Sequence, residues 1–302
     1  MLLNFKIQFF FILILFSFFL SGCTKSPSDN NPDTSSNSRL PLNDTGAVLF
    51  TQSFLESNTD PTVENLLSPI PDISAPGQDA DWGRDKTQNN ALDGKFGFQF
   101  IKLDEYGLPL SDQTDTYDET PWSCVKDSVT GLIWEVKTLS GLRLTSHTYT
   151  WYEPDDNLNG GFAGGRGSPE LCNANNLPTC DSNIDCESGN IPNCDTHGYK
   201  EAVNNLINPQ NNSRGLCGLT KWRLPLREEL RSIIDYGSTS GVALDTNYFP
   251  NALGVDTWTS QTSLYQATDG SEAWEVHLDT GKSETHKKIS RQVFVHLVHN
   301  PL

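Results

Sequence analysis

Four of the seven cysteines lie between residues 172 and 194, and this stretch limits what the chain can fold into more than any other. The stretch is rich in Asn, Asp, Pro and Gly and has almost no apolar side chain to bury. A segment of that composition cannot offset the entropy lost on ordering unless covalent bridges, each worth about 2–4 kcal/mol, hold it. A zinc site is the alternative, but the cysteines lie eight, six and eight residues apart and lack the close Cys pair that zinc sites use. We therefore predict a long loop closed by disulfides.

Disulfides need an oxidising compartment, and residues 1–22 predict export. Lys6 is followed by an almost uninterrupted apolar run from residue 7 to residue 20, and small residues precede Cys23. This order is typical of a secretory signal peptide, and the run is short for a span of roughly 20 residues. The sequence Leu20-Ser21-Gly22-Cys23 resembles the lipobox of bacterial lipoproteins. That resemblance implies acylation of Cys23, a lipid anchor in the membrane and, with Thr24 next, the outer membrane of the bacterial cell envelope.

Six cysteines remain once Cys23 is assigned to the lipid. An even number in an exported chain predicts a full set of disulfides, with 15 possible pairings. The six are Cys124, Cys172, Cys180, Cys186, Cys194 and Cys217.

Composition divides the rest of the chain into a tether and a folded region. Residues 23–78 begin with Ser, Asn, Asp, Pro and Thr and continue with recurrent prolines, so we expect a flexible tether and a partly ordered lead-in. Residues 79–302 are expected to form the domain, with a core at about 122–299. The net charge is −17, and removal of one lysine with the signal makes it −18. This charge argues against nucleic-acid binding, which normally needs clustered basic residues.

Hydrophobic periodicity predicts an α+β domain. Alternation predicts strands at residues 130–136 and 274–278, followed by a turn at residues 279–281 and a further strand from Arg291 to Val298. Helical spacing appears at residues 199–207 and 226–234, the second with Pro225 near its first turn and Gly237 at the position of a C-terminal cap.

Four ordered motifs resemble the Lcl C-terminal domain family, named after the terminal domain of a bacterial collagen-like adhesin and long catalogued as a domain of unknown function. They are Gly131-Leu132-Ile133-Trp134-Glu135, Trp222-Arg223-Leu224-Pro225 followed by Glu228-Glu229-Leu230, Tyr248-Phe249-Pro250, and Trp258-Thr259-Ser260. The matching motif residues are Trp134, Trp222, Arg223, Leu224, Pro225, Glu229, Leu230 and Trp258.

The resemblance implies a C-type-lectin-like fold, with a twisted antiparallel sheet, two helices and long disulfide-stapled loops. It implies a cell-envelope lipoprotein with a module for ligand binding or adhesion, and the partner is a glycan or an envelope protein. The family's adhesin binds sulfated glycosaminoglycans, but a charge of −18 opposes that ligand here. Two alternatives remain open. One is a structural envelope protein that acts by protein contact, and the other is a divergent enzyme of the formylglycine-generating kind. The latter needs a reactive cysteine pair, and the expected disulfides leave none.

Several residues are candidates for binding. Trp151 and Tyr152 beside Asp155 and Asp156 are the preferred contact region, because exposed aromatic rings in a polar loop commonly bind sugars. Oxygen-bearing side chains alternate at Asp181, Asn183, Asp185 and Glu187, as in calcium loops, although the turn glycine is missing. Calcium is the one cofactor that the sequence suggests.

Other candidates are weaker. His296 and His299 are expected on opposite faces of a strand, in structural roles. His277 and His286 lie in unrelated contexts, and the glycines from Gly160 to Gly167 predict a mobile loop. Basic residues recur at residues 286–291 and 221–231, where we expect ordinary solvated charge. No catalytic triad, nucleophile elbow or phosphate loop occurs, so we predict no enzymatic activity.

Overall fold

The computed structural model describes residues 50–51, 67–68, 97–166, 195–238, 241–289 and 293–302. The predicted signal peptide, Cys23, most of the tether, four of the cysteines and the predicted calcium ligands lie outside these residues, and they stay predictions. Within the described part of the chain, no helix has the length and apolar character that a bilayer crossing requires.

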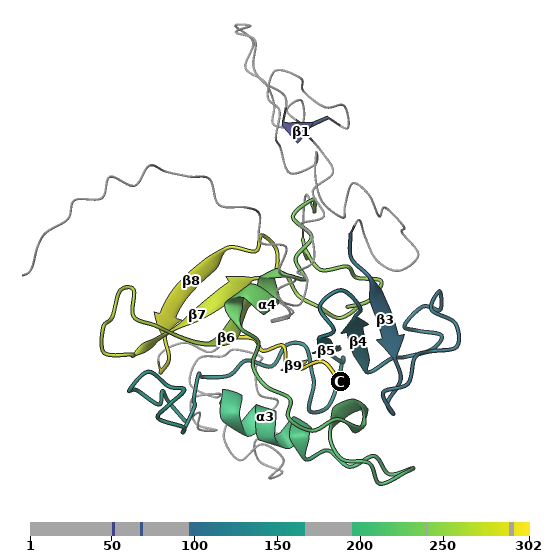
Figure 1. The fold of residues 1–302 in the computed structure, drawn as a ribbon, viewed down its shortest axis with the longest axis horizontal. Coiled ribbons are helices and arrows are strands. Elements are labelled where there is room, and N and C mark those ends of the chain that lie inside the picture. The colour runs from purple at the N-terminus through teal and green to yellow at the C-terminus, as the bar shows by residue number, and fades with distance from the viewer. Residues whose placement is uncertain (1–49, 52–66, 69–96, 167–194, 239–240, 290–292) are drawn as a thin grey trace, which may run out of the picture. The chain divides into compact units, whose positions relative to one another are not determined.

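Strands and short helices form an α+β fold, as predicted from the sequence (Figure 1). The strands are β1 (Phe50–Thr51), β2 (Leu67–Ser68), β3 (Phe100–Leu103), β4 (Cys124–Asp127), β5 (Ile133–Glu135), β6 (Asp256–Ser263), β7 (Glu272–His277), β8 (Ser283–Lys287) and β9 (Val298–His299). The helices are α3 (Thr196–Asn204), α4 (Arg227–Arg231) and a 3-10 turn at Leu216–Gly218. All strand pairs within the sheets are antiparallel, in the orders β1-β2, β3-β4-β5-β9 and β6-β7-β8.

The expected strand from Arg291 to Val298 is wrong. The turn at residues 279–281 is tight, so the chain pairs directly back onto β7 as β8, with Val276 opposite Ser283. The sequence Ser-Glu-Thr-His-Lys of β8 carries no apolar residue, and hydrophobic periodicity therefore missed it. Of the described residues of the expected strand, 293–298, only Val298 belongs to a strand, β9, while Val293 and Phe294 form isolated bridges to Tyr149 and Thr257.

The alternation at residues 274–278 sets Trp274 and Val276 on one face and Glu275 and His277 on the other, and the prediction that only the first face is buried is partly correct. Val276 is buried as expected, but Glu275 on the opposite face is buried too, and Trp274 is partly exposed. The physical reason is that β7 is the middle strand of its sheet, so side chains of β6 and β8 flank Glu275, while Trp274 lines a pocket. Simple alternation describes strands with one solvated face.

The two helices begin close to where the sequence predicted and end earlier. Asp195 caps α3, and its side chain accepts a hydrogen bond from the Gly198 amide at 2.8 Å. Leu206 and Ile207 lie beyond its end, and Ile207 is exposed. Helix α4 ends at Arg231, so Gly237 is not its cap.

Tryptophan rings hold the core together across long stretches of sequence. Trp134, Trp151, Trp222 and Trp258 are all fully buried. The Trp151 indole donates to the Thr259 carbonyl, and the Trp258 indole donates to the Tyr149 carbonyl, both at 2.8 Å. Each such bond satisfies the one polar atom of a large apolar ring. The segment near residue 150 is thereby fastened to β6.

A disulfide joins Cys124 on β4 to Cys217 in the 3-10 turn. The sequence predicted that both cysteines are oxidised, and it could not choose the pairing. The bridge closes a separation of 93 residues. Neither cysteine therefore offers a free thiol.

Candidate functional site

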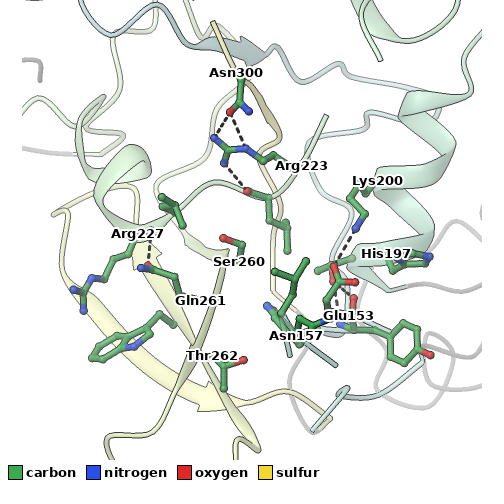
Figure 2. Close-up of a pocket in the computed structure, with 17 residues that line it drawn as sticks. Glu153, Asn157, His197, Lys200, Arg223, Arg227, Ser260, Gln261, Thr262 and Asn300 are labelled. Atoms are coloured by element: carbon green, nitrogen blue, oxygen red, sulfur yellow. Dashed lines mark hydrogen bonds and ion pairs between the residues drawn. The ribbon is translucent and has the colours of Figure 1, made fainter. Parts of the chain in front are cut away.

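The Trp-Arg-Leu-Pro segment fixes the geometry of the site, because it fastens the start of α4 to the C-terminal segment. The Arg223 backbone pairs with Val298 in both directions, at 3.0 and 2.9 Å. Its guanidinium makes two parallel bonds of 2.7 Å to the Glu229 carboxylate. It makes further bonds to Asn300 (Figure 2). Glu229 also accepts from the Leu226 amide at 2.8 Å, which satisfies a donor at the helix start. The motif is therefore a structural clamp.

Beside this clamp lies a pocket of about 660 Å³, which four parts of the chain form together (Figure 2). They are the segment from Trp151 to Leu158, the start of α3, the segment from Arg223 to Arg227, and the strands β6 and β7 with Asn300. The side chains are of mixed character, with aromatic, aliphatic, amide and charged groups. The pocket is the largest described concavity, and a concave site with a few convergent polar groups is the usual form of a ligand site.

Two partly exposed aromatic side chains line the pocket, Tyr152 and Trp274. The Arg166 guanidinium stacks on the Tyr152 ring at 5.0 Å, and the Arg227 guanidinium stacks on the Trp274 ring at 4.6 Å. Stacking of this kind holds both ring planes. The pocket therefore presents two supported aromatic surfaces.

The cations that line the pocket are paired with carboxylates. Lys200 donates to Glu153 at 3.0 Å, Arg223 binds Glu229, and Arg227 lies 2.8 Å from Glu228. The amide groups of Asn157 and Gln261 and the hydroxyls of Ser260 and Thr262 complete the polar lining (Figure 2). Balanced charge and neutral polar groups suit a neutral polar ligand better than a strongly anionic one.

Only part of the contact region that the sequence predicted lies at the pocket. Tyr152 lines the pocket, but the Trp151 ring is only 1% exposed and belongs to the core, which corrects the expectation of an exposed ring. Asp155 and Asp156 are exposed and do not line the pocket. Asp155 instead accepts a bond from the Asn157 amide at 2.9 Å and closes a turn. The next two residues along, Asn157 and Leu158, are the ones that reach the pocket.

The described part of the glycine segment, Gly160–Arg166, contacts Trp151 and Lys288, and its mobility stays a prediction. Gly164 has φ +92°, and a Cβ there would lie 2.1 Å from the Trp151 carbonyl oxygen. The Lys288 ammonium donates to the Asn159 and Phe162 carbonyls at 2.8 and 2.7 Å. Burial lowers the pKa of Lys288 to about 8. Because Lys288 is fully buried, it does not contribute to a basic surface at the described residues 286–289.

The four candidate histidines lie in two places, the C-terminal segment and the sheet β6-β7-β8. His296 is buried beside the Phe249 ring, and His299 is partly exposed with its ring near Trp222. His277 and His286, which the sequence placed in unrelated contexts, both lie near Glu275 on the sheet β6-β7-β8, one on each side of it. Burial and the neighbouring Glu284 raise the pKa of Glu275 to about 7. The repeated Glu-x-His pattern at residues 275–277 and 284–286 was the sequence signal that could have found this cluster.

The structure is a disulfide-containing α+β fold with a pocket on its surface. The model of the Lcl C-terminal domain matches residues 123–299, more than half of the chain, and this chain belongs to that family. The motif residues Trp134, Trp222, Leu230 and Trp258 are all buried, and Arg223 with Glu229 forms the clamp. No curated protein and no solved structure matches the chain.

Proposed function

We propose that this chain is a bacterial cell-envelope lipoprotein whose C-type-lectin-like domain binds a neutral glycan in the pocket beside the Arg223 clamp. The observation that carries the proposal is the pair of aromatic surfaces, Tyr152 and Trp274, within one polar pocket. The C–H face of a sugar ring packs against such rings, while its hydroxyls bond to amide and hydroxyl side chains. Acylation of Cys23 would hold the domain at the outer membrane, and a glycan ligand would give it an adhesive role.

Charge supports a neutral ligand over a sulfated one. The whole chain has a net charge of −17, and each of the three cations in the pocket already contacts a carboxylate. A sulfated chain would have to compete with Glu153, Glu228 and Glu229 for these cations. Calcium remains part of the proposal at residues 181–187, which lie outside the described residues.

A glycan array tests the proposal directly, using the full chain with and without calcium. We expect binding to neutral glycans, and we expect Trp274→Ala and Tyr152→Ala each to weaken it at least tenfold. Tyr106→Ala is the matched control, because Tyr106 is similarly accessible and does not line the pocket. Equal binding by all three variants, or binding only to sulfated glycans, would contradict the proposal. Silence across the array would favour the structural envelope protein that acts by protein contact.

A further inference from the structure

The strands β7 and β8 carry the same three-residue pattern on one face of their sheet. Glu275-Val276-His277 and Glu284-Thr285-His286 both read Glu-x-His, and side chains two residues apart share a face. The register places Glu275 directly opposite Glu284, and the strands run antiparallel. Each histidine is therefore diagonal to the glutamate of the other strand.

Strand β6 adds a fifth group, because Asp256 is directly opposite His277. The His277 Nε2 atom lies 2.7 Å from an Asp256 oxygen and 3.6 Å from a Glu284 oxygen. On the other side, the His286 Nδ1 atom lies 2.5 Å from a Glu275 oxygen. The five side chains thus converge from three neighbouring strands, which fix their positions more firmly than loops would.

Two sets of three groups have metal-ligand geometry. The first set is Asp256, Glu275 and His277, and the second is Glu275, Glu284 and His286. Within each set, the donor atoms lie within 4.8 Å of one another. Donors about 2.1 Å from a tetrahedral ion lie about 3.4 Å apart, so small side-chain shifts complete either set. Glu275 belongs to both sets and is fully buried, while the side chains of His277 and His286 are 27% and 32% exposed. An ion could therefore enter from solvent.

The donor chemistry selects the kind of ion. Imidazole nitrogen with carboxylate oxygen suits zinc and related first-row transition metals, whereas calcium prefers oxygen ligands alone. We propose that this face of β6-β7-β8 binds a divalent transition metal ion, with Glu275 as the ligand common to both sets. Trp274 precedes Glu275 and points from the opposite face of β7, where it lines the pocket. A bound ion therefore steadies the strand that carries one aromatic surface of the pocket.

Titration calorimetry of the full, oxidised chain with Zn²⁺, Mn²⁺ and Ca²⁺, after treatment with a chelator, tests the proposal. We expect saturable Zn²⁺ binding and weaker or no Ca²⁺ binding at this face. Glu275→Gln should weaken Zn²⁺ binding at least tenfold, and so should at least one of His277→Ala and His286→Ala. His197→Ala is the control for loss of a histidine outside the cluster, and it should leave the affinity unchanged.

Two further measurements distinguish a loss of metal binding from a loss of folding. Circular dichroism of each metal-free variant shows whether it folds, and the double variant His277→Ala/His286→Ala replaces Glu275→Gln if that variant does not. Co²⁺ in place of Zn²⁺ should give visible absorption that the double variant loses. Absence of Zn²⁺ binding, or the same affinity in wild type and the double variant, would show that the five groups only bond to one another.

Discussion

In the sheet β3-β4-β5-β9 most charged groups, such as Lys102, Asp127 and Glu135, are buried, whereas in the sheet β6-β7-β8 most of them lie partly exposed. Glu135 at the end of β5 and Lys137 just after it are 0% and 3% exposed. Their side chains lie 3.1 Å apart, and both bond to the Tyr199 hydroxyl on α3. In the other sheet, the side chains of Asp256, His277 and Glu284 are 16%, 27% and 34% exposed.

The difference separates structural charge from charge available to a ligand. Burial alone would raise the pKa of Glu135, but Lys137, His296 and the Tyr199 hydroxyl lower it. Glu135 also accepts a bond from the Leu297 amide at 3.0 Å, so its partners span β5, α3 and the C-terminal segment. Charged groups whose partners all lie in the core stabilise the fold. Charged groups at the surface can exchange a protein partner for a ligand.

The largest expected effect comes from breaking the buried pair. Lys137→Met leaves the Glu135 carboxylate buried without its cation, and we expect a loss of about 3–5 kcal/mol in the free energy of unfolding. Chemical denaturation measures it. Lys126→Met on the neighbouring strand β4, where the lysine is partly exposed, is the matched control and should stay within about 0.5 kcal/mol. Equal effects at the two lysines would show that burial does not decide how much a charged group contributes to stability.

The Cys124–Cys217 disulfide lies in the same sheet as this buried pair, because Cys124 is on β4. Replacing both Cys124 and Cys217 with alanine should lower the free energy of unfolding by about 2–5 kcal/mol, because the bridge restricts the unfolded chain over 93 residues. Thermal unfolding of this double variant reports the bridge without reducing any other disulfide. A melting temperature equal to that of the wild type would show that packing alone holds β4 against the 3-10 turn.

Acid should weaken the buried network through His296. Burial, reinforced by the nearby Lys137, lowers the pKa of His296 to about 4, against an ordinary value of 6.5. Between these values the unfolded chain binds the proton and the folded chain does not, so stability falls as the pH falls from about 6.5 to 4. The loss is about 3 kcal/mol. Unfolding measured across this range in wild type and His296→Gln checks it, and the variant should show a flatter profile. A ring that titrates near 6.5 by NMR would contradict the prediction.

The smallest effect is expected at the rim of the pocket. The Arg227 and Glu228 side chains are 31% and 52% exposed, and water screens their ion pair. Glu228→Gln should therefore change the free energy of unfolding by less than about 1 kcal/mol. Thermal unfolding checks this, and a loss comparable to that of Lys137→Met would show that the rim is as structural as the core.

Part of the candidate site could be predicted from sequence, and part could not. Trp151 and Tyr152 were both expected as exposed rings of a binding surface, and Tyr152 does line the pocket, whereas Trp151 is buried. The partner of Tyr152, Trp274, was expected in the core, because the alternation of β7 does not show that a pocket lies beside that face. The pocket joins residues from 151 to 300, and no local pattern encodes that meeting.

By itself, the sequence determined the α+β class and the positions of the two helices, because these follow from local periodicity. The oxidation of Cys124 and Cys217 follows from the even number of cysteines, and the family follows from contiguous motifs. The tertiary structure alone decided that Cys124 pairs with Cys217, that Trp151 is buried while Trp274 faces a pocket, and that two Glu-x-His strands meet in register. The physical reason is that pairing, burial and strand register depend on contacts between residues far apart in the chain. Such contacts are selected by the packing of the whole core.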